Sequence, residues 1–131
     1  MTTRTASCSC GQLRADVTGE PIRVSVCHCY ACQRRTGCVF AAQARFAQEA
    51  VNIRGQGTQF IRIGDEGGKM TFTFCPTCGS TVFYVQDGAE QLIAIPVGAF
   101  ADSGFPSPTV SVYEERMHSW VAMPRDIEHI T

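Results

Sequence analysis

The sequence predicts a mainly β protein, a single domain over residues 1–131 in which short strands pair in antiparallel sheets. Residue usage favours pleated sheet, because two leucines stand against eleven valines, eight isoleucines, eight phenylalanines and twelve threonines. Apolar and polar residues alternate along many short segments, and glycine-containing turns separate these segments. A length of 131 residues is typical of one domain and is sufficient to bury a hydrophobic core.

The alternating segments give the expected strands in chain order. Leu13, Ala15 and Val17 alternate with polar residues, and the later segments repeat this pattern. Asp87-Gly88 is a favourable hairpin turn. Helical turns are expected only at residues 29–35 and 43–49. The expected strands cover residues 13–19, 21–27, 40–46, 51–53, 59–63, 70–74, 81–85, 91–97, 110–112 and 119–122.

Composition and charge exclude several classes of protein. Eleven basic and twelve acidic side chains give a net charge of −1, so we expect no nucleic-acid partner. The longest apolar run, residues 92–101, contains Pro96 and Gly98 and falls short of the roughly 20 residues that span a bilayer. The N-terminal residues lack the apolar core of a signal peptide. We therefore expect a cytoplasmic protein without membrane contact, in which stable disulfides are rare.

Eight cysteines are the most informative feature of the sequence, and seven of them fall into short groups. Cys75-Pro76-Thr77-Cys78-Gly79 is a specific signal, because two thiolates at this spacing reach one ion across a tight turn. Such a turn supplies only half of a tetrahedral zinc site. Cys8 and Cys10, followed by Gly11, offer a second pair. The sequence thus predicts one closed, structural zinc site with the ligands Cys8, Cys10, Cys75 and Cys78.

A third group, Cys27-His28-Cys29-Tyr30-Ala31-Cys32, places three thiolates within six residues. Three protein ligands and one open position form the usual pattern of a catalytic zinc site. The sequence therefore predicts two zinc ions per chain, the second held by Cys27, Cys29 and Cys32.

Other ligand arrangements remain open from the spacing. The triplet would become a closed structural site if Cys38, His118 or a carboxylate supplied a fourth ligand. As in a zinc ribbon, the Cys29/Cys32 pair would instead share an ion with the Cys-Pro-x-Cys-Gly turn. A four-cysteine site could also bind an iron–sulfur cluster. An arrangement in which all cysteines form disulfides is disfavoured, because we expect a cytoplasmic protein.

Two residues near the triplet are expected to have no metal-binding role. We expect Cys38 to be buried as a small apolar side chain. His28 lies between two ligands, so we expect its side chain to point away from the ion and to pack or form a hydrogen bond.

Candidate substrate-binding residues follow the triplet and recur near the C-terminus. Arg34 and Arg35, with Thr36 next to them, would hold the carboxylates of an anionic substrate, or would form a solvated basic turn that balances the thiolates. His118 would be a proton carrier in a pocket wall. For the segment that contains His118 we favour the alternative, which is a final strand with Trp120 in the core.

The ordered motifs Cys-x-Cys, Cys-His-Cys-x-x-Cys-x-Arg-x-Thr-Gly and Phe-Cys-Pro-x-Cys-Gly-Ser resemble those of the glutathione-dependent formaldehyde-activating enzyme and centromere-protein-V family. The resemblance covers residues 8–120. It implies a β-tent-like fold of stacked antiparallel sheets with two zinc sites. Its structural site corresponds here to Cys8, Cys10, Cys75 and Cys78, and its catalytic site to Cys27, Cys29 and Cys32.

The resemblance also implies an activity, the addition of glutathione to formaldehyde, which in the reverse direction is a carbon–sulfur lyase reaction. We therefore expect a zinc-dependent enzyme that acts on a thiol adduct, such as that of glutathione, of a small aldehyde. The alternatives are a zinc-stabilised binding or scaffold module without catalysis and a thiol redox or metal-handling protein. The edge strands of a small sheet would permit a homodimer.

Overall fold

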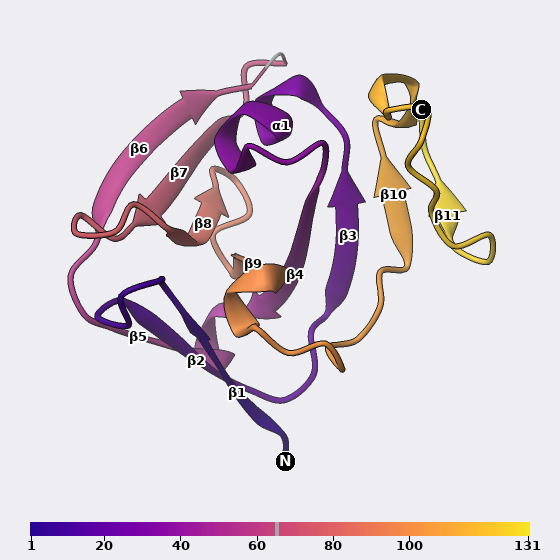
Figure 1. The fold of residues 1–131 in the computed structure, drawn as a ribbon. Coiled ribbons are helices and arrows are strands. Elements are labelled where there is room, and N and C mark those ends of the chain that lie inside the picture. Colours follow the sequence, from indigo (N-terminus) through magenta and orange to yellow (C-terminus); the bar gives the residue numbers. More distant parts are fainter. Residues whose placement is uncertain (65) are drawn as a thin grey trace.

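A computed structural model describes residues 1–64 and 66–131, and across these residues the strands form two sheets (Figure 1). The small sheet has the order β1-β2-β5 and is antiparallel throughout. The large sheet has the order β11-β10-β3-β4-β9-β8-β7-β6. In Figure 1 the large sheet curves around a central region, with α1 across one end and the small sheet below the other. The predicted mainly β fold with stacked sheets is confirmed.

The elements have the following bounds. The small sheet contains β1 (Thr3–Ser7), β2 (Arg14–Thr18) and β5 (Val51–Arg54). The large sheet contains β3 (Arg23–Cys27), β4 (Ala41–Ala47), β6 (Thr58–Ile63), β7 (Lys69–Phe74), β8 (Thr81–Gln86), β9 (Leu92–Pro96), β10 (Val110–Val112) and β11 (Glu128–His129). The helices are α1 (Tyr30–Thr36) and the short 3₁₀ helices η1 (Gln48–Ala50), η2 (Val97–Phe100) and η3 (Glu114–Arg116).

Three sequence predictions of local structure were wrong. Residues 119–122 do not form a strand, and the last strand is β11, which pairs in parallel with β10. Residues 43–47 belong to β4 because this segment pairs with both β3 and β9, and the helical turn is limited to η1. The sheet is also not wholly antiparallel, since β10 pairs in parallel with β3.

The two faces of the large sheet have different roles. One face packs with the small sheet around the largest buried cluster, in which Leu13, Phe46 and Ile95 are almost fully buried. The opposite, concave face presents alternate residues of β3 and β4 to the cavity described below, among them Ser25 and Gln43. Trp120 is 73% exposed and not in the core, which corrects the preferred interpretation of its segment. Among the described residues, none of the helices has the length and the apolar character that a membrane span requires.

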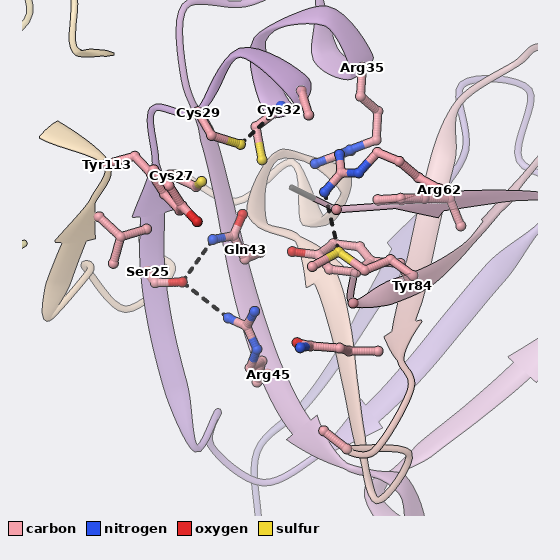
Figure 2. A pocket seen from close by; sticks show the side chains of 18 of the residues that line it. Ser25, Cys27, Cys29, Cys32, Arg35, Gln43, Arg45, Arg62, Tyr84 and Tyr113 are labelled. Atoms are coloured by element: carbon pink, nitrogen blue, oxygen red, sulfur yellow. Dashed lines mark hydrogen bonds between the residues drawn. The ribbon is translucent and has the colours of Figure 1, made fainter. Parts of the chain in front are cut away.

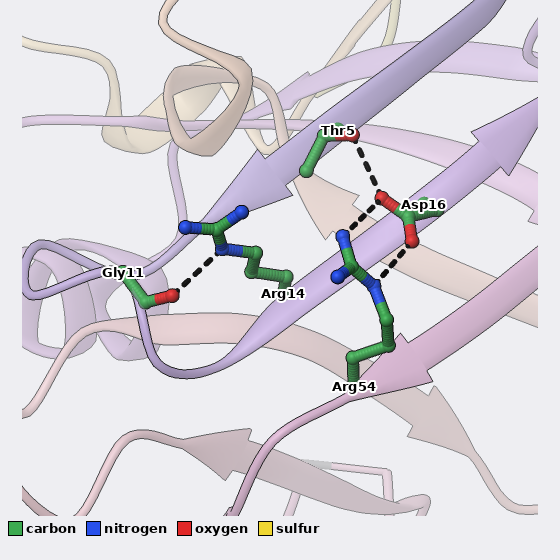
Figure 3. Close-up of polar contacts among 5 residues, drawn as sticks. All are labelled: Thr5, Gly11, Arg14, Asp16 and Arg54. Carbon is green, nitrogen blue, oxygen red and sulfur yellow. Dashed lines mark hydrogen bonds and ion pairs between the residues drawn. The ribbon is translucent and has the colours of Figure 1, made fainter.

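Polar contacts secure the outer face of the small sheet (Figure 3). Asp16 on β2 accepts hydrogen bonds from Thr5 at 2.7 Å and from Arg54 at 2.6 and 3.1 Å. The hydrogen bonds from Arg54 and Thr5 lower the pKa of the Asp16 carboxyl group. Arg14 Nε donates to the carbonyl oxygen of Gly11 at 2.7 Å. This contact connects β2 to the turn that carries Cys8 and Cys10.

Gly55 allows the chain after β5 to pass close to Gln12, and we expect Gly55→Ala to destabilise the protein. Its φ is +101°, and a Cβ atom there would collide with the carbonyl oxygen of Gln12. Gly19→Ala is the matched control, because its φ is +86° and nothing lies near the added carbon. We expect a loss in the free energy of unfolding of about 3 kcal/mol for Gly55→Ala and about 1 kcal/mol for Gly19→Ala, measured by urea denaturation. Equal losses would contradict the proposed close approach.

Candidate metal centres and their cavity

The first cluster consists of Cys8, Cys10, Cys75 and Cys78, whose sulfur atoms all lie within 4.8 Å of one another. The Sγ atoms of Cys8 and Cys10 are 3.6 Å apart, as are those of Cys10 and Cys75. Four thiolates around a tetrahedral zinc, with Zn–S distances of about 2.3 Å, would be about 3.8 Å apart. The cluster therefore fits a four-thiolate zinc ion, and the alternative pairing of Cys75/Cys78 with Cys29/Cys32 is excluded in this structure.

Two similar turns bring these four sulfur atoms together. The N–H of Gly11 donates to the carbonyl oxygen of Cys8, and the N–H of Gly79 donates to that of Cys75. Gly11 and Gly79 have φ values of +86° and +83°, which glycine adopts without steric cost. The first turn follows β1 and the second connects β7 to β8, so an ion bound here would link the two sheets.

Hydrogen bonds to sulfur favour the thiolate forms of Cys75 and Cys78, whereas burial and contacts with the neighbouring thiols raise the pKa of Cys10 to about 11. The N–H of Leu13 donates to Cys8 Sγ at 3.3 Å, and Gln12 Nε2 donates to Cys75 Sγ at 3.0 Å. The backbone N–H groups of Ser80 and Cys10 lower the pKa of Cys78 to about 5. Burial opposes ionisation of Cys75, but the Gln12 amide and nearby N–H groups outweigh it and lower the pKa of Cys75 to about 7. Two of the four sulfur atoms are thus favoured as thiolates, the form that binds a metal cation.

The second cluster contains Cys27, Cys29 and Cys32, again with all sulfur atoms within 4.8 Å. Cys27 ends β3, Cys29 is the N-cap of α1, and Cys32 lies in the first turn of that helix. Cys29 Sγ accepts a hydrogen bond from the N–H of Cys32 at 3.3 Å, so the helix start itself sets the spacing of two sulfur atoms. Within residues 1–64 and 66–131, no fourth cysteine, histidine or carboxylate joins this cluster.

The residues considered as additional ligands lie elsewhere. His28 is buried and its Nε2 lies 2.9 Å from Ser111 Oγ, consistent with the expected hydrogen bond away from the cluster. Cys38 is exposed, which corrects the expectation that it is buried. His118 Nε2 is 3.1 Å from Gln33 Oε1. All eight cysteines, each within the described residues, are free thiols, so no disulfide forms.

Nearby charges act on the sulfur atoms of the second cluster. A hydrogen bond from Cys27 lowers the pKa of Cys32 to about 5 against the effect of burial, and the positive charges of Arg35 and Arg62 add to this lowering. The pKa of Cys27 is raised, because its hydrogen bond to Cys32 and its burial favour the thiol. The basic groups therefore favour a thiolate at the cluster, as a metal ligand requires.

The second cluster opens on a cavity of about 650 Å³ on the concave face of the large sheet (Figure 2). Among the described residues that line it, six are arginines and one is acidic, Glu66. The arginines are Arg23, Arg34, Arg35, Arg45, Arg62 and Arg116. This surplus of positive charge attracts an anionic ligand.

A hydrogen-bonded group forms one wall of the cavity below the cysteines (Figure 2). Ser25 Oγ accepts from Gln43 Nε2 at 2.8 Å and from Arg45 at 3.1 Å. Tyr84 also lines the cavity; burial raises its pKa to about 12, further above neutral pH than its ordinary value, and its hydroxyl is a hydrogen-bond donor.

The structure brings only some of the predicted substrate-binding residues to this cavity. Arg34 and Arg35 line it. The hydroxyl of Thr36 donates to the carbonyl oxygen of Cys32 at 2.9 Å, and neither Thr36 nor His118 is among the lining residues. The sequence analysis missed Ser25, Gln43, Arg45, Arg62 and Tyr84, all of which line the cavity. The sequence did contain a signal for these residues, namely polar side chains at alternate positions of otherwise apolar strands.

Comparison with known proteins places this arrangement in a family. Residues 3–116 match the family described as glutathione-dependent formaldehyde-activating enzyme. A crystal structure of a Rhodobacter sphaeroides protein, a structural-genomics target, has a TM-score of 0.57 and 20% sequence identity, and the alignment covers 97% of this chain and 99% of that one. At this identity the likeness shows the fold alone. No curated protein matches the chain. Because the match spans most of the sequence, the chain belongs to the glutathione-dependent formaldehyde-activating enzyme family.

Proposed function

We propose that the protein is a zinc-dependent carbon–sulfur lyase that acts on the thiol adduct of a small aldehyde such as formaldehyde, with glutathione as a candidate thiol. The observation that carries this proposal is the three-cysteine cluster, which has no fourth ligand among the described residues and lies in the wall of a cavity. Membership of the family supports the pairing of a thiol with an aldehyde.

Each cysteine cluster is proposed to hold one zinc ion. Cys8, Cys10, Cys75 and Cys78 would form the structural site, and Cys27, Cys29 and Cys32 the catalytic one. A zinc ion with an open position stabilises a thiolate at neutral pH and polarises a carbonyl oxygen. Both effects would accelerate the addition of a thiol to an aldehyde and its reversal.

The side chains of the cavity would handle the oxygen of the adduct. In the lyase direction, the carbon–sulfur bond breaks, the hydroxyl of the adduct loses its proton and becomes the aldehyde carbonyl, and the sulfur leaves as a thiol. Gln43 Oε1 can accept the hydrogen bond of that hydroxyl, since Ser25 fixes the amide orientation. The Tyr84 hydroxyl can donate a hydrogen bond to the carbonyl oxygen that forms. Arg34 and Arg35 would bind acidic groups of the thiol.

The proposed reaction can be measured by magnetic resonance with ¹³C-formaldehyde and glutathione. We expect the zinc-loaded protein to accelerate exchange between free formaldehyde and its glutathione adduct by at least tenfold over a heat-denatured sample of the same protein. Exchange at the uncatalysed rate by a folded protein with both zinc ions bound would contradict the proposal and favour a binding module.

A further inference from the structure

Two arginines from distant parts of the chain meet at one aromatic ring in the cavity. Arg35 lies in α1 and Arg62 in β6. The Cζ atom of each is 5.0 Å from the centroid of the Phe72 ring, and that of Arg35 is also 5.4 Å from the Tyr84 ring. In Figure 2 the two guanidinium groups point toward one another. Contact with a ring face supports each cation, but it leaves the in-plane N–H groups free to bind another ligand.

Several of these N–H groups are buried without a hydrogen-bond partner. Among the described residues, they are Nε of Arg35 and both Nε and Nη1 of Arg62, whereas Nη2 of Arg62 donates a hydrogen bond to the Met70 sulfur at 3.3 Å. Across residues 1–64 and 66–131, neither guanidinium forms an ion pair with a carboxylate. Two converging cations with unsatisfied buried donors are unfavourable. An anion between them would offset the positive charge and would accept hydrogen bonds from these donors.

The thiolates of the second cluster do not by themselves balance these charges. Three thiolates on one zinc ion carry a net charge of −1, whereas the two guanidinium groups carry +2. The other arginines of the cavity add to this excess, and Glu66 is the one acidic residue among the described lining. The remaining positive charge therefore favours the binding of one further anion next to the cluster.

We propose that Arg35 and Arg62 form a clamp for an oxyanion of the substrate, a carboxylate or a phosphate, so that the thiol recognised by this cavity is an acid. This inference rests on the proposed function and names its substrate class. Arg35 follows Cys32 by three residues in α1, and both arginines line the same cavity as the three cysteines of the second cluster. The oxyanion and the sulfur of the substrate would thus bind to neighbouring parts of one cavity. Arg62 is therefore a specificity-determining residue.

The test uses two thiols of matched length, 3-mercaptopropionate and 3-mercapto-1-propanol, in calorimetric titrations of the zinc-loaded protein. We expect Arg62→Met to weaken binding of the acid by about ten- to hundredfold and to leave binding of the alcohol and the zinc content unchanged. Arg54→Met is the matched control, because Arg54 pairs with Asp16 on the small sheet. Equal weakening for both thiols, or loss of zinc from Arg62→Met, would show that Arg62 only balances the thiolates.

A second measurement needs no variant. Acetate and inorganic phosphate, added separately, should compete with 3-mercaptopropionate for the wild-type protein, and the stronger competitor identifies the type of oxyanion. Failure of both to compete would overturn the clamp. Because these measurements detect binding without turnover, absence of lyase activity together with acid-selective binding would refute the proposed function while retaining the clamp.

Discussion

Cys78→Ser is expected to leave the protein largely unfolded at neutral pH. The four-cysteine cluster joins the turn after β1 to the turn between β7 and β8, and thereby connects the two sheets. Structural zinc in small domains contributes about 10–16 kcal/mol of binding free energy, whereas a whole domain is stable by about 5–15 kcal/mol. Loss of one thiolate should therefore remove most of the folding free energy. Far-ultraviolet circular dichroism and zinc analysis would measure the two effects.

Cys38→Ser provides the control for this substitution, because it makes the same chemical change at an exposed cysteine outside both clusters. We expect Cys38→Ser to retain the wild-type spectrum, melting temperature and zinc content. A folded Cys78→Ser protein with the wild-type melting temperature would contradict a structural role for the first cluster.

Cys27→Ser is expected to have the opposite combination of effects, with the fold kept and activity lost. The second cluster is formed by the end of β3 and the adjacent helix α1, and therefore connects only neighbouring segments. Its loss should remove one zinc ion and reduce the exchange to the uncatalysed rate, since a catalytic metal supplies several kcal/mol of transition-state stabilisation. Zinc analysis, circular dichroism and the exchange assay would be applied to the same sample.

The comparison between the two variants is decisive for the division of roles. If Cys27→Ser unfolded the protein as completely as Cys78→Ser, both clusters would be structural. If Cys27→Ser kept full activity, the triplet would not be the catalytic site.

The two cysteine clusters could be predicted from the sequence because short turns fix most of their geometry. Cys75 and Cys78 lie within one turn, and the Cys27–Cys32 group spans only a strand end and a helix start. Strands with clear alternation, such as β4 and β7, were predicted to within a few residues. Strand β1 was missed because Ala6 is its only buried residue, so its sequence carries almost no apolar alternation.

The cavity could not be predicted, because its walls depend on how the large sheet curves. Arg35 and Arg62 meet only because α1 and β6 both approach Phe72, and no local pattern specifies that approach. Trp120 and His118 were predicted in a strand or a pocket wall. In the structure their rings contact each other, with centroids 6.1 Å apart, and residues 119–122 do not form the expected strand.

The central claim is that one cluster is closed by four sulfur ligands and the other leaves one position open. X-ray absorption at the zinc edge, combined with zinc analysis of the purified protein, tests it most directly. The account predicts two zinc ions per chain with an average of about 3.5 sulfur ligands each and a lighter ligand at the remaining position. A single zinc ion with four sulfur ligands, or two zinc ions that each have four, would contradict it.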